Sequence, residues 1–113
     1  MINVSSIAGL TRGSPTNGVY SAAKAGLNHL TKTLALEMAP FNIRVNAILP
    51  GSVRTEDYED ASGGDDEYFE AMAKNQPLKR LGKGEDFGAA AVYLASDASS
   101  WVTGSLMMVS GGP

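Results

Sequence analysis

The sequence has 113 residues, 43% of them hydrophobic and 19% charged, which suffices for one small globular domain and excludes a disordered chain. Cysteine is absent, which excludes disulfides and thiolate metal sites and fits a cytoplasmic location, and no apolar run approaches the roughly 18 residues of a membrane-spanning helix. The formal charge of −3 comes without a basic patch, so nothing supports nucleic-acid binding, and no group of side chains has the spacing of a metal site.

The chain opens with a predicted strand followed by a loop. Residues 2–5 alternate apolar and polar side chains, the period of a half-buried strand. Three glycines, Pro15 and several hydroxyl residues follow within residues 9–18, and this composition indicates a loop. A serine pair, Ser5 and Ser6, therefore stands where the strand ends.

A long helix is predicted over residues 19–38. Its apolar positions recur at intervals of four, three and four, and several alanines add helix propensity. Pro40 and Asn42 end the pattern. The residues that set this amphipathic period are Ala23, Leu27, Leu30 and Leu34.

The middle of the chain holds a second predicted strand and an acidic loop. Residues 43–47 alternate apolar and polar side chains and predict a strand that Pro50 and Gly51 close. Eight of the twelve acidic residues lie within residues 56–70, and clustered like charges resist burial. We therefore expect residues 52–64 to form a solvated loop.

Two helices and a third strand complete the predicted order. Residues 65–74 favour a short helix entered at Asp65 or Asp66 as the N-cap. Residues 85–95 predict a clearer helix, because apolar side chains recur at positions i, i+3, i+4 and i+7. Residues 106–109 are all apolar and predict a buried strand. The apolar positions of the second of these helices are Phe87, Ala90, Ala91 and Leu94.

Strands that alternate with helices favour an α/β fold, with a parallel sheet and helices on its faces. Three strands are few for such a sheet, and the first begins almost at Met1. We therefore expect a partial doubly wound, Rossmann-like sheet whose N-terminal strands are missing. Strand edges and faces exposed in this way promote association, so the isolated chain is expected to be oligomeric, loosely folded or aggregation-prone.

Tyr20 and Lys24 are four residues apart at the start of the long predicted helix, so they project from one face. A cation beside a phenol favours the phenolate, and such a pair can exchange a proton with a substrate oxygen near neutral pH. The spacing taken alone favours instead a tyrosine that packs over a lysine stem on a helix surface, because many helices contain such a pair by chance.

Several motifs in one order carry a stronger signal than that pair. They resemble the classical branch of the short-chain dehydrogenase/reductase family, and the ketoacyl reductases most of all. The motifs are INVSSIAG (2–9), YSAAKAGL (20–27), IRVNAILPG (43–51), PLKRLG (77–82), LASD (94–97) and VTG (102–104).

The resemblance implies a catalytic set of Ser6, Tyr20 and Lys24. Ser6 would hydrogen-bond the substrate oxygen, and Tyr20 would be the general acid in reduction and the general base in oxidation. Lys24 would assist Tyr20 and bind the hydroxyls of the nicotinamide ribose. Ser5 competes for the serine role, but strand alternation places it on the opposite face.

The resemblance also implies a cofactor-binding turn and a variable loop. Tyr20 and Lys24 would contact the cofactor, together with the turn after the second strand. Residues 52–76 would form the substrate-binding loop. The turn residues are Pro50, Gly51, Val53, whose backbone would contact the carboxamide, and Thr55.

Aromatic side chains in the variable loop leave two interpretations open. Tyr58, Tyr68 and Phe69 would either line a substrate pocket or anchor the loop on the core. Trp101 and residues 102–104 match a family segment involved in subunit packing. We therefore expect a homo-oligomer, a dimer or tetramer, formed through the helix at 19–38.

The family's glycine-rich cofactor signature, its Asn-Asn-Ala-Gly segment and its catalytic asparagine have no counterpart here. We therefore expect residues 1–113 to be the C-terminal catalytic part of one Rossmann-type domain, with the choice between NAD and NADP undetermined. The function implied is hydride transfer between NAD(P)(H) and a small alcohol or ketone. The alternative is a truncated, non-catalytic fragment or assembly module, and an epimerase or dehydratase is a more distant third.

Overall fold

The computed structural model describes residues 1–57, 59 and 63–112. Its centre is a sheet of three parallel strands in the order β1 (Ile2–Val4), β2 (Asn46–Pro50) and β3 (Leu106–Val109). Strand β2 is central and hydrogen-bonds to both neighbours. The predicted α/β class and parallel sheet are confirmed.

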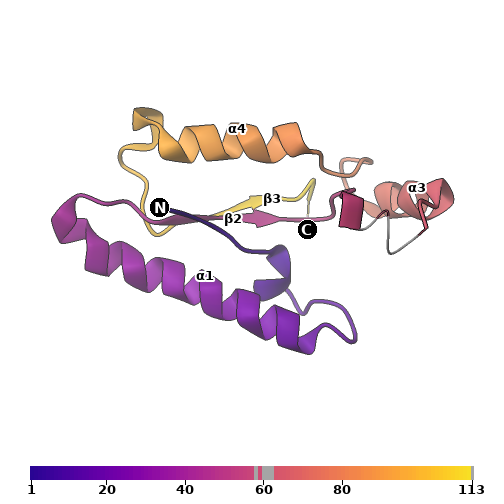
Figure 1. Ribbon diagram of the computed structural model, residues 1–113, viewed down its shortest axis with the longest axis horizontal. Helices are drawn as coiled ribbons and strands as arrows, with labels where there is room; N and C mark the ends of the chain where they lie inside the picture. The colour runs from indigo at the N-terminus through magenta and orange to yellow at the C-terminus, as the bar shows by residue number, and fades with distance from the viewer. Residues whose placement is uncertain (58, 60–62, 113) are drawn as a thin grey trace.

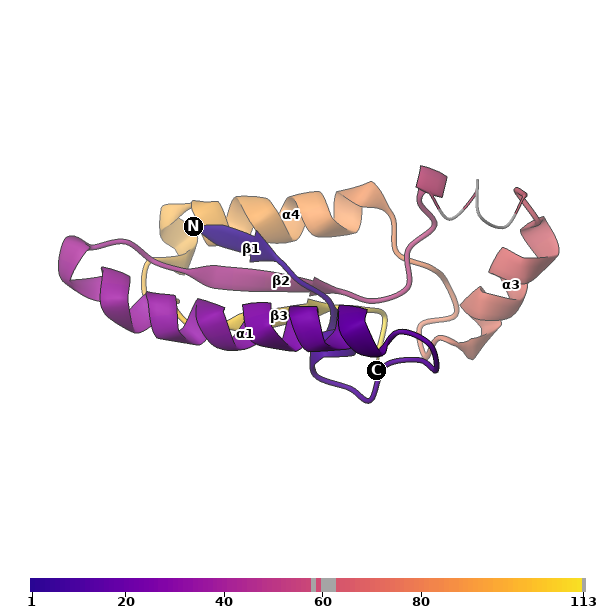
Figure 2. The same ribbon diagram turned by 60° about the horizontal axis from the view of Figure 1, so that its bottom comes forward.

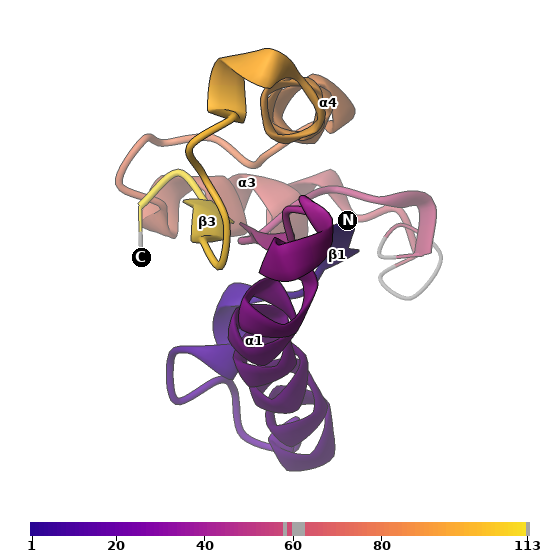
Figure 3. The ribbon, with the colours of Figure 1, turned by 90° about the vertical axis from the view of Figure 1, so that its left-hand side faces the viewer.

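Helices cover the sheet on both faces, as Figures 1 and 3 show. Helix α1 (Gly18–Met38) lies on one face and α4 (Gly84–Ala95) on the other. Helix α3 (Asp66–Asn75) lies beyond the end to which β2 points, away from both layers (Figure 2). Three short 3₁₀ helices complete the described elements: η1 (Ile7–Gly9), η2 (Ala39–Phe41) and η3 (Asp97–Ser99).

The predicted helices agree with the structure to within one residue at each end. The Asp65 side chain accepts a hydrogen bond from the Glu67 backbone N–H, which confirms it as the N-cap of α3. On α4 the four predicted apolar positions form the less exposed side of the helix, and Leu94 is buried. Phe69 of α3 is also buried, so it anchors the acidic segment, whereas Tyr68 is exposed and Tyr58 lies outside the described residues.

The predicted bounds of the second strand are wrong. The strand runs from Asn46 to Pro50, and Ile43, taken as an inward-facing strand residue, is exposed. Positions 45–49 are all buried because α1 and α4 cover the two faces of this central strand, so no alternation survives. Asn46, a polar member of the predicted alternation, is 1% exposed; its Nδ2 donates to the Val102 carbonyl and its Oδ1 accepts from the Ser105 N–H.

The predicted burial of the third strand is also only partly right. Strand β3 stands at the edge of the sheet, and Met108 is half exposed there. An edge strand has a neighbour on one side only, so an apolar sequence does not ensure complete burial.

Helix α1 packs through small and polar side chains rather than through its leucines. Asn28, Thr31 and Ala35 are its buried residues, while Ala23 and Leu30 of the predicted apolar period are exposed. Thr31 Oγ1 accepts from Asn3 Nδ2 on β1 and donates to the carbonyl of Leu27. Small side chains allow the helix to lie close to the sheet, which brings its first turns next to the end of β1.

Arg44, just before β2, joins the sheet to the end of α4. Its guanidinium donates to the carbonyls of Leu94, Ser96 and Val102 at 2.9, 3.2 and 3.1 Å. Carbonyls at a helix C-terminus lack partners within the helix, and a cation is favourable there. This contact holds α4 in place over β2.

We expect Arg44→Met to lower the free energy of unfolding by about 2–4 kcal/mol, because partly buried carbonyls lose a charged donor. Urea unfolding followed by circular dichroism measures the change. Arg12→Met is the matched control, since Arg12 is exposed on the loop before α1, and it should change stability by less than about 0.5 kcal/mol. Equal effects of the two substitutions would contradict the role given to Arg44.

Candidate active site

A cleft of about 620 Å³ opens where β1 and β2 end, at their carboxyl edge. Ligands of open α/β sheets bind at this edge. We call it the carboxyl-edge cleft. Its lining includes six of the seven residues that the sequence singles out for catalysis or cofactor binding: Ser6, Tyr20, Pro50, Gly51, Val53 and Thr55.

The two serines after β1 have different surroundings. Ser5 is buried, and its hydroxyl donates to the carbonyl of Lys24 on α1. Ser6 is half-buried, and its Oγ accepts from the Ala8 N–H at 3.1 Å as the N-cap of η1. The Ser5 hydroxyl is thus engaged in joining the sheet to the helix, and the Ser6 hydroxyl retains its own proton for a ligand in the cleft.

Tyr20 and Lys24 lie on the first turns of α1. Tyr20 is 48% exposed and lines the cleft. The Lys24 Nζ is 5.6 Å from the centre of the Tyr20 ring and donates to the Val4 carbonyl at 3.3 Å. Lys24 is not part of the cleft lining, so it stands beside Tyr20 as a fixed positive charge between the helix and the end of β1.

Gly9 sets how closely the turn that carries Ser6 approaches α1. A Cβ at this position would lie 2.6 Å from Asn28 Nδ2 and 2.7 Å from both the Ala25 nitrogen and the Lys24 carbonyl carbon. Two of these three atoms are helix backbone and cannot move aside. Sequence reasoning missed this role, because Gly9 counted only as one of the residues typical of a loop.

The far wall of the cleft is the turn after β2. The Gly51 N–H donates to the Val109 carbonyl at 3.0 Å, and a Cβ on Gly51 would lie 2.6 Å from Ser110 Cβ. Val53 pairs with Gly82 in a parallel bridge, and the Gly82 N–H donates to the Ser52 carbonyl at 3.0 Å. The turn is therefore held from behind by two other segments.

Arg54, in the same turn, holds the acidic segment. Its Nε donates to Glu59 Oε1 at 2.6 Å and its Nη2 to Asp66 Oδ1 at 2.9 Å. Its guanidinium also stacks on the Phe69 ring at 4.3 Å. The two carboxylates raise the pKa of Arg54 above its ordinary value, and together these contacts attach α3 to the edge of the cleft.

The donor types along the cleft suit a nicotinamide and its ribose. Hydroxyls from Ser6, Tyr20 and Thr55 surround a volume typical of small-molecule sites, and the Lys24 ammonium lies at its margin. Gly51 keeps the wall free of a side chain. In the part of the chain that the structure describes, no three potential ligands gather to hold a metal ion. No described helix is long and apolar enough to cross a membrane.

Comparison with known proteins gives separate evidence on the family of this chain. Residues 1–113 match the family described as enoyl-(acyl carrier protein) reductase. The 3-oxoacyl-(acyl-carrier-protein) reductase FabG of Chlamydia trachomatis is 44% identical over 112 residues, which are 99% of this chain and 44% of that protein. Glucose 1-dehydrogenase 2 of Bacillus subtilis is 43% identical over 98 residues, or 87% of this chain and 37% of that protein.

A solved structure is similar over nearly the whole chain. The Pseudomonas aeruginosa RhlG/NADP active-site complex superposes with a TM-score of 0.88 at 32% identity. The similar region covers 98% of this chain and 44% of that one. The present chain thus spans less than half the length of the relatives named here.

We expect Gly9→Ala to destabilise the chain by about 1–3 kcal/mol, because the new methyl group overlaps the backbone of α1. Gly26→Ala is the matched control on the same helix. A Cβ at Gly26 meets nothing within 4 Å, so this change should stabilise the chain by up to about 1 kcal/mol through helix propensity. Thermal unfolding of both variants measures the difference, and a Gly9→Ala variant as stable as the parent would refute the close contact.

Proposed function

Because this chain belongs to the short-chain dehydrogenase/reductase family, we propose that it serves NAD(P)-dependent hydride transfer between a nicotinamide and a hydroxyl or carbonyl group. Residues 1–113 would be the C-terminal catalytic part of one Rossmann-type domain, an assignment supported by the share of the relatives that they cover. The lack of cysteine favours a cytoplasmic enzyme.

One observation carries the proposal: Ser6, the N-cap of η1, and Tyr20, on α1, line the same cleft, with the Lys24 ammonium 5.6 Å from the Tyr20 ring. A hydrogen-bond donor, a proton donor and a fixed cation are the groups that carbonyl reduction needs around the reacting oxygen. Tyr20 and Lys24 occupy successive turns of one helix, while Ser6 is brought to them by the packing of η1 on α1.

Each of the three residues would have a distinct role. A nicotinamide held in the cleft would supply the hydride that reduces the carbonyl carbon. The Tyr20 hydroxyl then gives its proton to the oxygen, so that the products are an alcohol and the oxidised nicotinamide. Ser6 Oγ donates a hydrogen bond to that oxygen and stabilises its developing negative charge. Lys24 stabilises the phenolate left on Tyr20. Alcohol oxidation uses the same groups in reverse.

The turn after β2 would receive the nicotinamide. Pro50, Gly51, Val53 and Thr55 line the same cleft as Tyr20. Lys24, whose ammonium lies 5.6 Å from the centre of the Tyr20 ring, would bind the ribose hydroxyls. NADP in the Pseudomonas aeruginosa complex supports NAD(P) as the cofactor class. The present sequence holds no glycine-rich dinucleotide signature, so its residues do not select between NAD and NADP.

The substrate would be a small alcohol or ketone. Two relatives whose names imply different substrates, an acyl-carrier-protein reductase and a glucose dehydrogenase, are 44% and 43% identical to this chain. Overall identity therefore does not choose the substrate. The segment that Arg54 attaches to the edge of the cleft is the part placed to do so.

An assembly role is the second candidate, favoured by apolar side chains that α1 leaves exposed. Val19 and Leu36 are 88% and 79% exposed, and Leu30 lies between them in the sequence and is also exposed. Apolar side chains exposed in such number on one helix favour association. A homodimer or tetramer through α1 would cover them, and it would do so whether or not the chain is catalytic.

We expect Tyr20→Phe to lower kcat by about 100-fold or more, because it removes the proton donor and leaves the ring in place. Oxidation of NADH or NADPH in the presence of ketones, followed by the loss of nicotinamide fluorescence, measures the rate. Tyr93→Phe, a half-exposed tyrosine of α4, is the matched control and should keep full activity.

Two outcomes would contradict the proposal. Unchanged turnover in Tyr20→Phe would remove Tyr20 from the proton transfer. A chain that neither binds nor oxidises NADH or NADPH at millimolar concentration would have no dehydrogenase function by itself. The assembly role would then be the remaining candidate function.

A further inference from the structure

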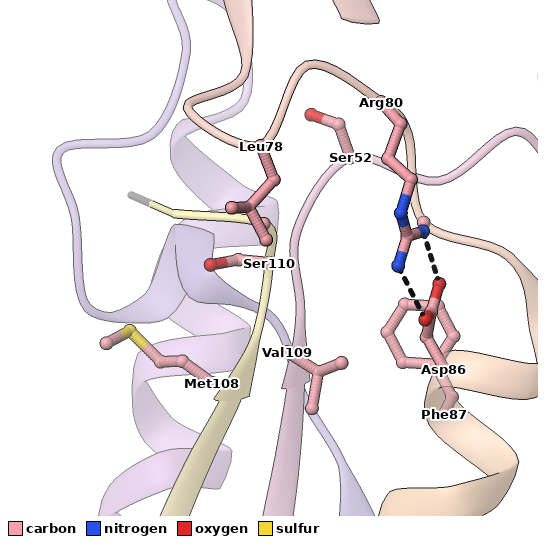
Figure 4. Close-up of a pocket in the computed structure, with 10 residues that line it drawn as sticks. Ser52, Leu78, Arg80, Asp86, Phe87, Met108, Val109 and Ser110 are labelled. Carbon is pink, nitrogen blue, oxygen red and sulfur yellow. Dashed lines mark hydrogen bonds and ion pairs between the residues drawn. The ribbon is translucent and has the colours of Figure 1, made fainter.

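A bidentate salt bridge between Arg80 and Asp86 lies in the lining of a second pocket, of about 300 Å³ (Figure 4). Ser52 lines both this pocket and the carboxyl-edge cleft. Arg80 Nη1 lies 2.8 Å from Asp86 Oδ2, and Arg80 Nη2 lies 2.9 Å from Asp86 Oδ1. Arg80 comes from the segment after α3, and Asp86 comes from the first turn of α4. The guanidinium and the carboxylate face each other squarely in the close-up.

The salt bridge closes residues 80–86 into a loop, which we call the 80–86 loop. Asp86 Oδ2 also accepts from the Lys83 N–H at 2.9 Å, so the same carboxylate caps α4. Arg80 Nη1 donates in addition to the Leu81 carbonyl at 3.1 Å. Arg80 and the Lys83 N–H hold the pKa of Asp86 well below its usual range, so the carboxylate stays charged at neutral pH.

Gly82, inside this loop, is the point of contact with the cleft wall. Its N–H donates to the Ser52 carbonyl, and it bridges Val53 in parallel register. A Cβ on Gly82 would lie 3.1 Å from Phe87 Cζ and 3.4 Å from Val53 Cγ2, so the loop, the helix and the wall are in close contact. Ser52 and Val53 both line the cleft.

An isolated exposed ion pair contributes little, but this pair differs in two respects. It is bidentate, and the Asp86 side chain is only 23% exposed. It also joins the two ends of the 80–86 loop, in which Gly82 hydrogen-bonds to the wall. A change in the pair therefore reaches the Val53 backbone through Gly82, without any contact of Arg80 with the cleft itself.

We propose that Arg80 and Asp86 are positioning residues that set the place of the Val53 backbone, and with it the wall that receives the nicotinamide. The ligand named here rests on the proposed function. The mechanical link from Arg80 through Gly82 to Val53 does not, and it can be measured separately.

The test compares Arg80→Gln, Asp86→Asn and the double variant with the parent chain. Glu85→Gln is the matched control, because it removes one negative charge from the same helix turn and leaves the salt bridge intact. Two quantities are measured: the Kd for NADH and NADPH by nicotinamide fluorescence, and the hydrogen exchange of the Gly82 amide by NMR. Thermal unfolding shows that each variant is folded under the conditions used.

Each single variant should raise the cofactor Kd about tenfold, since a small displacement of a positioned group has effects of this order or larger. The double variant should bind the cofactor no more weakly than either single variant, because both substitutions break the same link. Gly82 exchange should be faster in all three variants, and Glu85→Gln should leave both quantities unchanged. In turnover assays, the cofactor KM should rise while the ketone KM stays constant.

The outcomes separate this inference from the proposed function. If the parent chain binds no nicotinamide, the proposed function fails. The hydrogen exchange of the Gly82 amide then tests the link from Arg80 to Val53 by itself. Unchanged Gly82 exchange in Arg80→Gln and Asp86→Asn would overturn the inference. So would faster exchange with an unchanged cofactor Kd in a parent chain that does bind, since the pair would then be merely structural.

Discussion

The burial of β2 on both faces is the constraint on which the other features depend. Helices α1 and α4 cover this strand from opposite sides, and each is joined to the sheet by polar contacts at defined points. At its amino end, Arg44 and Asn46 bind the segments that follow α4. At its carboxyl end, Pro50 and Gly51 begin the wall of the cleft. A strand fixed at both ends gives that wall a rigid base.

Close backbone approach, rather than apolar side chains, brings the candidate catalytic groups together. Helix α1 presents Asn28, Thr31 and Ala35 to the sheet, and Gly9 lets the Ser6 turn rest directly on the helix. Ser5 completes the joint by donating to the Lys24 carbonyl. Neighbouring residues therefore have different roles: Ser5 joins the sheet to α1, whereas Ser6 has the proposed chemical role in the cleft.

Charge pairs hold the two segments that surround the cleft from outside. Arg54 attaches α3, and Arg80 closes the loop that supports Val53. Both arginines are paired with carboxylates, Arg54 with Glu59 and Asp66 and Arg80 with Asp86.

The sequence by itself determined the order of the elements, the bounds of three helices to within one residue and the shared face of Tyr20 and Lys24, and it narrowed the N-cap of α3 to Asp65 or Asp66. These are local properties, set by periodicity and by neighbours within one or two helical turns. The family motifs added the residues of the cleft. The bounds of β2, the buried side of α1, the role of Gly9 and the link from Arg80 to Val53 were decided only by the tertiary structure. Each depends on contacts between distant parts of the chain, such as Arg44 with Val102, and no local pattern records which groups will meet or whether both faces of a strand will be covered.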